Sequence, residues 1–169
     1  MSLEIERKFQ VDDSWDIPSG CATTSVRQAY LTSPEAGTEV RVRSLADTYL
    51  LTVKAPRDDG AVGLNVREEV EFPIDEQVFL RLWALAPDRL AKDRTTVPLE
   101  GLDGTEAVVD VYTGTHAGLR VVEVEFEDTA RARAFEPPEW FGPEITGQSA
   151  WGNRTLARAS RRPEQPEAV

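Results

Sequence analysis

Alternation of apolar and polar residues runs through most of the 169-residue chain and predicts β-strands. In the opening stretch, MSLEIERKFQV, a strand would place Glu4, Glu6 and Lys8 on one face and mainly apolar residues on the other. Similar stretches recur between turn-forming segments such as SPEAG, APRDDGAVG, LEGLDG and TGTHAG. The predicted strands are Leu3–Val11, Ser25–Leu31, Glu39–Leu45, Thr48–Lys54, Asn65–Phe72, Lys92–Val97, Glu106–Tyr112 and Arg120–Phe126.

Two segments outside these strands have the pattern of helices. PIDEQVFLRLWAL offers Asp75 as an N-cap and would bury Val78, Leu82 and Leu85 on one side. EDTARARAF offers Asp128 as the cap of a shorter helix. Strands in series with a few helices predict an α+β domain in which the strands run antiparallel.

The C-terminal segment GQSAWGNRTLARASR is expected to end the fold as a helix, with Trp151, Leu156 and Ala150 facing inward. The Pro- and Glu-rich stretch that follows predicts a disordered tail. We therefore expect one domain over residues 1–160 and a tail over residues 161–169, because a chain of this length suffices for one sizeable core.

Charged residues are sorted by sign along the predicted strands. Three strands carry Glu-x-Glu and two carry a pair of bases. Like charges side by side on a sheet face cost some tenths of a kcal/mol to about 1 kcal/mol. A solvated face explains any one pair, whereas five pairs in one chain favour a cavity whose ligand relieves the repulsion. The pairs are Glu4/Glu6, Glu69/Glu71, Glu123/Glu125, Arg41/Arg43 and Lys92/Arg94.

The residue types in these pairs indicate the class of ligand. Carboxylates without His or Cys beside them are hard oxygen donors that suit Mg²⁺ or Mn²⁺ rather than Zn²⁺. Arg and Lys suit phosphate oxygens, Arg as a bidentate fork and Lys as a point charge. Both sets on one sheet face predict a site for a metal–polyphosphate complex. Closing the sheet into an eight-stranded barrel would turn this face inward, and helices would then cover the apolar face.

Composition narrows the range of partners and compartments. The formal net charge of −11 disfavours non-specific nucleic-acid binding. No stretch is apolar enough to span a bilayer, the charged N-terminus does not resemble a signal peptide, and the lone Cys21 forms no internal disulfide. A cytoplasmic location is the simplest expectation. His116 has no His or Cys companions, so we expect an exposed loop residue rather than a ligand.

Taken together, these residues resemble the CYTH superfamily, also called the triphosphate tunnel metalloenzymes. The N-terminal Glu-x-Glu-x-Lys, here EIERK, is the hallmark of that family, and the resemblance continues through RQAYL, EVRVR, LLTVK, REEVEF, KDR, VVDVY, VVEVEF and EIT…NRTLA. The motifs follow the family's order and approximate spacing over nearly the whole domain. The resemblance implies an eight-stranded antiparallel β-barrel, forming a tunnel open at both ends, with a few flanking helices.

The resemblance also implies roles for the charged residues. Lys92, the lysine of the Lys-x-Arg element, would be catalytic and activate water, its pKa depressed by Arg94 and other cations. Glu4 and Glu6 would share in catalysis as metal ligands. The phosphate-binding residues would be Lys8, Arg41, Arg43, Lys54, Arg67, Lys92 and Arg94. The ligands of Mg²⁺ or Mn²⁺ would be Glu4, Glu6, Glu69, Glu71, Glu123 and Glu125, with support from Asp110.

One stretch departs from the family pattern. Many members carry Asp-x-Arg-Tyr after the Glu-[Val/Ile]-Thr near the C-terminus, whereas Gln148, Ala150 and Trp151 stand in those places here. One acid and one base of the tunnel lining would then be missing, which leaves the full metal coordination and the full activity open. Trp151 is expected to pack the terminal helix onto the barrel.

The leading hypothesis is a divalent-metal-dependent hydrolase of triphosphates, in the first place inorganic tripolyphosphate, with no nucleic-acid or membrane partner. Three alternatives stay open: an adenylate cyclase of the same superfamily that converts ATP to cyclic AMP and pyrophosphate, a non-catalytic polyphosphate- or nucleotide-binding module, and a plain structural domain. No motif clearly encodes an adenine pocket; Trp83 and Trp140 are candidates for one, but core packing is the better explanation of both. A homodimer is compatible with the sequence, in which no interface is evident.

Overall fold

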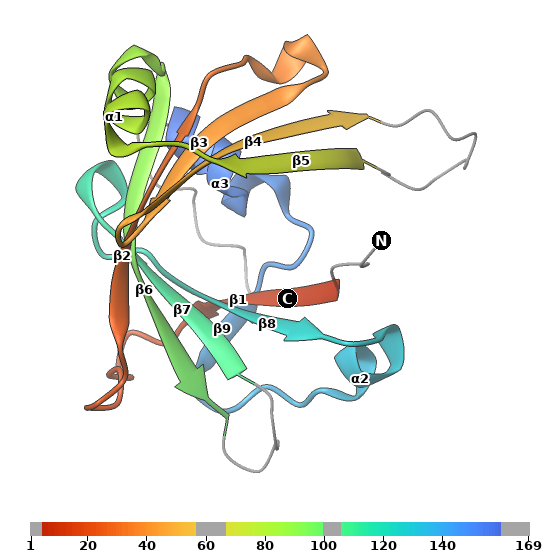
Figure 1. Cartoon of the computed structure of the whole chain (residues 1–169). Helices are drawn as coiled ribbons and strands as arrows, with labels where there is room; N and C mark the ends of the chain where they lie inside the picture. The colour runs from red at the N-terminus through yellow and green to blue at the C-terminus, as the bar shows by residue number, and fades with distance from the viewer. Residues whose placement is uncertain (1–4, 57–66, 100–105, 160–169) are drawn as a thin grey trace. The chain divides into compact units, whose positions relative to one another are not determined.

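The structure, a computed structural model, describes residues 5–56, 67–99 and 106–159 and contains nine strands and three α-helices in these ranges (Figure 1). The eight predicted strands are confirmed there, and β9 is an addition. The strands are β1 (Ile5–Val11), β2 (Thr23–Tyr30), β3 (Glu39–Leu45), β4 (Thr48–Pro56), β5 (Arg67–Pro73), β6 (Asp88–Pro98), β7 (Glu106–Tyr112), β8 (Arg120–Phe126) and β9 (Phe141–Glu144). The helices are α1 (Glu76–Leu85), α2 (Thr129–Ala134) and α3 (Asn153–Arg158).

The chain divides into two compact units, each with antiparallel strands and its own core. The first unit takes its described residues from Met1–Thr24 and Lys92–Gly152, and the second from Ser25–Ala91 and Asn153–Ala159. Strands are ordered β6-β7-β8-β1-β9 in the first unit and β5-β4-β3-β2 in the second. Across the described ranges, every helix is too short or too polar to cross a membrane. Closure into a barrel, and a single domain over residues 1–160, stay predictions.

One face of the strands in the first unit forms a hydrophobic core. Phe9 on β1 and Val122 and Val124 on β8 are buried there. Asp128 caps α2 as predicted, and Phe135 at the end of that helix packs its ring 6.4 Å from the ring of Phe9. Because successive residues of a strand point to opposite faces, the charged residues between these apolar ones lie on the other face.

In the second unit, α1 packs against β3 and β4 (Figure 1). Asp75 caps the helix as predicted, because its side chain accepts a hydrogen bond from the Val78 backbone N–H at 2.8 Å. The predicted buried face is wrong: Val78 is 39% and Leu85 76% exposed. Phe79 is fully buried instead, with its ring 5.9 Å from that of Trp83, because the larger aromatic side chains remove more apolar surface from water.

The C-terminal segment is not the single helix that the sequence predicts. A 3₁₀ turn, Ser149–Trp151, precedes α3, and Gly152 between them has an extended backbone that interrupts the helix. Trp151 and Leu156 are buried as predicted. Ala150 is exposed, so the expectation that it faces inward is wrong.

His116 corrects another expectation, because it is a buried residue rather than an exposed one. It ends the 3₁₀ turn Gly114–His116, and its ring lies edge-on to the ring of Tyr112 at 6.5 Å. The turn folds back onto the end of β7 through the hydrogen bond from the Tyr112 N–H to the Leu119 carbonyl at 2.9 Å. The TGTHAG stretch therefore places a buried side chain within the first unit, although its composition is that of a loop.

Replacing Phe79 with Ala should lower the free energy of unfolding by about 3–5 kcal/mol, because the change empties a buried site that a ring fills. Val78→Ala is the matched control, on the face that the sequence pattern predicted to be buried, and should cost no more than about 0.5 kcal/mol. Urea denaturation followed by far-ultraviolet circular dichroism measures both values. Equal losses in the two variants would contradict this assignment of the buried face.

Candidate functional site

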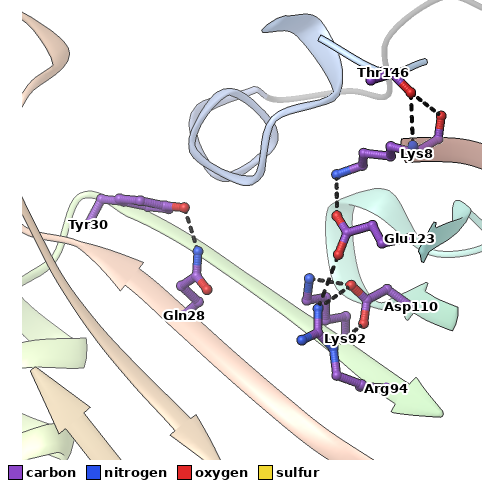
Figure 2. Close-up of polar contacts among 8 residues, drawn as sticks. All are labelled: Lys8, Gln28, Tyr30, Lys92, Arg94, Asp110, Glu123 and Thr146. Carbon is purple, nitrogen blue, oxygen red and sulfur yellow. Dashed lines mark hydrogen bonds and ion pairs between the residues drawn. The ribbon is translucent and has the colours of Figure 1, made fainter. Parts of the chain in front are cut away.

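A buried carboxylate, Asp110, holds the two bases of the Lys-x-Arg element in the first unit (Figure 2). Asp110 lies on β7 directly opposite Arg94 on β6. Arg94 donates from Nε to Oδ1 and from Nη2 to Oδ2, both at 2.8 Å. Lys92 Nζ donates to Oδ2 at 2.5 Å. Asp110 is thus the shared counterion of two predicted phosphate-binding residues, and its support of a metal stays a prediction.

Burial and charge act in opposite directions on the protonation of this cluster. Burial raises the pKa of the Asp110 carboxyl, but the Arg94 hydrogen bond and the charges of Lys92 and Arg94 together hold that pKa below its usual value. Burial lowers the pKa of Lys92, the charge of Asp110 raises it in part, and Arg94 lowers it further. The expected depression of the Lys92 pKa is therefore present, with burial rather than neighbouring cations as its main cause.

Glu123 on β8 extends the network to β1 (Figure 2). Lys8 and Glu123 stand opposite each other in register, and Lys8 Nζ lies 2.8 Å from Glu123 Oε1. The other oxygen, Oε2, lies 3.6 Å from Arg94 Nη2. Like charges therefore follow each strand while opposite charges meet across strands, which offsets part of the repulsion inferred from the sequence pattern.

Glu6 and Glu125 form the exception to this cross-strand pairing. They stand directly opposite each other on β1 and β8, and both are exposed. Two carboxylates at facing positions repel each other unless a cation lies between or beside them. Within residues 5–56, 67–99 and 106–159, no three His, Cys, Asp or Glu residues are grouped closely enough to hold a metal. Glu4, the other predicted ligand on this strand, lies outside the described residues.

The second unit holds a separate cluster of bases on β3 and β4, balanced by acids of β5. Lys54 Nζ lies 2.7 Å from Glu69 Oε2, and Arg41 Nη2 lies 3.8 Å from Glu69 Oε1. Arg43 Nη2 lies 3.6 Å from Glu71 Oε2. The structure therefore gathers the predicted bases of this unit, and Glu69 and Glu71 act as their counterions. A metal-binding role for these acids stays a prediction, and the side chain of Arg67 lies outside the described part of the chain.

Sequence reasoning missed polar residues beside these bases. Tyr30 on β2 stands opposite Arg41, and its hydroxyl accepts a hydrogen bond from the Gln28 amide. Arg154 on α3 donates to Glu39 Oε2 at 3.1 Å, and its guanidinium carbon lies 5.6 Å from the Tyr30 ring. Burial, with the charge of Glu39, raises the pKa of Tyr30 to about 12. The period-two pattern of RQAYL could have predicted that Gln28 and Tyr30 share a strand face. The contacts of Arg154 with Glu39 and Tyr30 arise only in the folded chain, because Arg154 is more than 100 positions away from both.

Comparison with known proteins identifies the family. The chain is 39% identical over 156 residues to an inorganic triphosphatase from Nitrosomonas europaea, covering 91% of this chain and 96% of that protein. It is 30% identical over 165 residues to an inorganic triphosphatase from Acetivibrio thermocellus, covering 94% of this chain and 95% of that protein. A crystal structure of an inorganic triphosphatase matches with a TM-score of 0.75 at 35% identity, covering 94% of this chain and 97% of that one. No protein-family model matches.

The chain therefore belongs to the inorganic triphosphatase family, and its resemblance to the CYTH superfamily is confirmed. The agreement extends over nearly the full length of both relatives.

Replacing Asp110 with Asn should destabilise the protein by about 3–5 kcal/mol at pH 7, because two bases lose their buried counterion. The pKa of Asp110 is lowered on folding, so its contribution to stability is present above the unfolded pKa of about 3.9 and is lost as pH falls through the folded pKa. The gap between wild type and variant should therefore narrow below about pH 4.

Urea denaturation at several pH values between 7 and 3 measures this gap. Asp93→Asn is the control, since Asp93 lies on β6 between Lys92 and Arg94 and strand alternation directs its side chain to the opposite face of the sheet. A loss for Asp110→Asn that stays constant across this pH range would contradict the assignment.

Proposed function

We propose that the chain is an inorganic triphosphatase that hydrolyses tripolyphosphate to pyrophosphate and phosphate with Mg²⁺ or Mn²⁺. The observation that supports this most strongly is the gathering of bases on the charged strand face of each unit, against acids that hold them in place. A linear inorganic triphosphate consists only of negatively charged phosphoryl groups, without a base or sugar that a protein could recognise. Cationic side chains are therefore the groups that can bind it. Those bases are Lys8, Lys92 and Arg94 in the first unit and Arg41, Arg43 and Lys54 in the second.

Arg41, Arg43 and Lys54 would bind phosphoryl oxygens in exchange for Glu69 and Glu71. The Arg–Glu contacts at 3.6 and 3.8 Å are longer than a direct charge-assisted hydrogen bond of about 2.7–2.9 Å. Both acids are partly exposed, so water solvates them once the bases turn to phosphate. Before the substrate binds, the acids hold the side chains of the bases in extended conformations. This reduces the conformational entropy that these side chains lose on binding.

Lys92 would accept the proton of the attacking water. Burial lowers the pKa of Lys92, which increases the fraction of neutral amine able to act as a base. The ammonium that forms is stabilised by Asp110, whose Oδ2 lies 2.5 Å from Nζ. Arg94 stays charged, because its hydrogen bonds to Asp110 raise its pKa, and it stabilises the charge that spreads over the phosphoryl oxygens.

The carboxylates of the first unit fit a divalent cation. Glu6 and Glu125 face each other in register, and hard oxygen donors are what Mg²⁺ and Mn²⁺ prefer. Mg²⁺ commonly takes only one or two carboxylates and completes its shell with water and phosphate oxygens. We propose that these two residues hold the metal together with Glu4 and Glu123, where it supplies neutralisation and polarisation of phosphoryl oxygens.

We also propose that the strands close into the eight-stranded antiparallel tunnel that the CYTH resemblance implies. The match to a solved inorganic triphosphatase over 94% of this chain supports this architecture. The predicted ligand-binding residues of β1, β3, β4 and β8 each lie on one face of their strand, which supports it as well, because a closed sheet shields such a face from bulk water. A cytoplasmic location, inferred from the single cysteine, stays a prediction, as does a homodimer.

A phosphate-release panel tests the activity. Tripolyphosphate, thiamine triphosphate, ATP and pyrophosphate are each offered with Mg²⁺, with Mn²⁺ and with a chelator in place of metal. We expect tripolyphosphate to give equal amounts of phosphate and pyrophosphate, and the chelator to abolish release, because the carboxylates of the first unit need a cation to bind the substrate. Cyclic AMP formed from ATP would indicate a cyclase instead, and tight binding of tripolyphosphate without turnover would indicate a binding module.

Arg43→Gln should lower kcat/KM for tripolyphosphate about 10- to 100-fold, because it removes charge-assisted hydrogen bonds to phosphate. Arg27→Gln is the matched control: Arg27 has similar burial in the same unit, but its guanidinium lies 5.0 Å from the ring of Phe79, on the apolar side of the sheet. The control should stay within about threefold of wild type in the same steady-state assay. Equal losses in both variants would mean that general destabilisation, rather than phosphate binding, explains the effect.

A further inference from the structure

Lys8 is held in the first unit through its backbone, on the side away from β8. Its N–H donates to Thr146 Oγ1 at 2.9 Å, and its carbonyl accepts from the Ile145 N–H at 2.8 Å. The regular pairing of β1 with β9 shifts register between Phe9 and Val11, and β9 ends at Glu144. A threonine hydroxyl therefore stands where a strand carbonyl would otherwise accept the Lys8 N–H.

The Thr146 hydroxyl is oriented by a carboxylate. Its Oγ1 lies 2.7 Å from Glu144 Oε1 and 3.3 Å from the Lys8 carbonyl. A hydroxyl has one hydrogen, and an ionised carboxylate at the shorter distance is the stronger acceptor. Donation to Glu144 directs the lone pairs of Oγ1 toward the Lys8 N–H.

Glu144 is fixed in turn by Arg7. Arg7 donates from Nε to Oε1 at 2.9 Å and from Nη2 to Oε2 at 2.7 Å, and its Nη1 donates to the carbonyls of Ala132 and Phe135. The hydrogen bond from Arg7 holds the pKa of Glu144 below its usual value, so this acceptor stays ionised at neutral pH. The pair lines a solvent-open cavity of about 440 Å³, where water screens the pair.

Neighbouring residues of β1 connect the Thr146–Glu144–Arg7 contacts to the charged face of the strand. Arg7 points toward α2, whereas Lys8 points to the opposite face, where Nζ meets Glu123 (Figure 2). Both backbone groups of Lys8 bond toward residues 145–146, so Lys8 and Glu123 form a non-hydrogen-bonded pair, the arrangement that brings facing side chains closest. The backbone position of Lys8 therefore determines where its ammonium lies.

We propose that Thr146 is a positioning residue for Lys8: oriented by Glu144 and Arg7, its hydroxyl fixes the Lys8 backbone and thereby the ammonium that binds phosphate. This inference rests on the proposed function for its catalytic consequence but not for its geometry. Because Lys8 binds phosphate before and during the reaction, loss of its position weakens binding of substrate and transition state alike. The effect therefore falls on KM rather than on kcat.

Thr146→Val keeps the shape of the side chain and removes the hydroxyl. We expect KM for tripolyphosphate to rise about three- to tenfold with kcat within about twofold, and Thr146→Ser to restore wild-type KM, because serine keeps the hydroxyl. Thr23→Val is the control for loss of a threonine hydroxyl: it removes the hydrogen bond with Thr95 at 2.8 Å in the same unit, and Thr23 lies on β2. A rise in KM in the control as large as in Thr146→Val would overturn the proposal, as would a change confined to kcat or a failure of serine to restore KM.

Amide hydrogen exchange at Lys8, followed by NMR, tests the geometry without reference to activity. Exchange at Lys8 should accelerate about tenfold or more in Thr146→Val relative to the amide of Val122, and should return toward wild type in Thr146→Ser. An unchanged Lys8 amide would overturn the proposal even if the enzyme is active. A wild-type protein that leaves tripolyphosphate intact would instead refute the proposed function, while the exchange experiment still decides the role of Thr146.

If Thr146→Val does not fold, Glu144→Gln carries the same test. The amide keeps the shape but loses the charge that orients the hydroxyl, so we expect KM to rise about two- to threefold with kcat unchanged. A Glu144→Gln variant with wild-type KM and wild-type Lys8 exchange would overturn the proposal.

Discussion

The constraint on which the rest of the structure depends is that each strand has only two faces and gives one of them to a hydrophobic core. On β8, Val122 and Val124 are buried, so Glu123 between them has to point the other way. The same holds on β3, where Val42 is buried and Arg41 and Arg43 flank it. Charged side chains are thereby concentrated on one face, where opposite charges compensate one another across strands.

Two kinds of carboxylate follow from this concentration of charge. The side chain of Asp110 is 1% exposed and binds two bases, so its removal leaves uncompensated buried cations. The side chain of Glu69 is 42% exposed and contacts Lys54 and Arg41, which water can solvate in its place. Asp110 is therefore a fixed part of the buried cluster, whereas Glu69 is the partly exposed counterion that phosphate would replace in the proposed function.

Strand faces could be predicted from the sequence because a period of two leaves a single choice, whereas a short helix leaves several. In α1, Val78, Leu82 and Leu85 form one apolar stripe and Phe79, Leu82 and Trp83 another. The sequence pattern does not distinguish them, and packing of Phe79 against Tyr49 and Trp83 decides between them. β9 escaped prediction because FGPE contains Gly and Pro and has no alternation, so its pairing with β1 arises only in the folded chain.

The sequence also predicts which charged residues share a strand face. It does not predict which residues they pair with, because the pairs depend on the register between strands that are distant in the chain. Arg94 and Asp110 meet across β6 and β7, and Lys8 meets Glu123 across β1 and β8. The burial of Lys92 could not be predicted from the sequence either. The pKa of Lys92 is lowered mainly by desolvation, which depends on the packing of the whole unit. The roles of Thr146 and Arg154 rest on contacts more than 100 positions apart in the chain.

The charge balance around Asp110 connects this packing to the proposed chemistry. Lys8, Lys92 and Arg94 are three bases joined to two acids, Asp110 and Glu123, so this group carries one surplus positive charge when every base is protonated. A neutral Lys92 removes the surplus, which agrees with the lowered pKa that burial gives it. In the proposed mechanism, a phosphate bound beside this group would add negative charge and so would stabilise the ammonium that forms when neutral Lys92 accepts the proton of the attacking water.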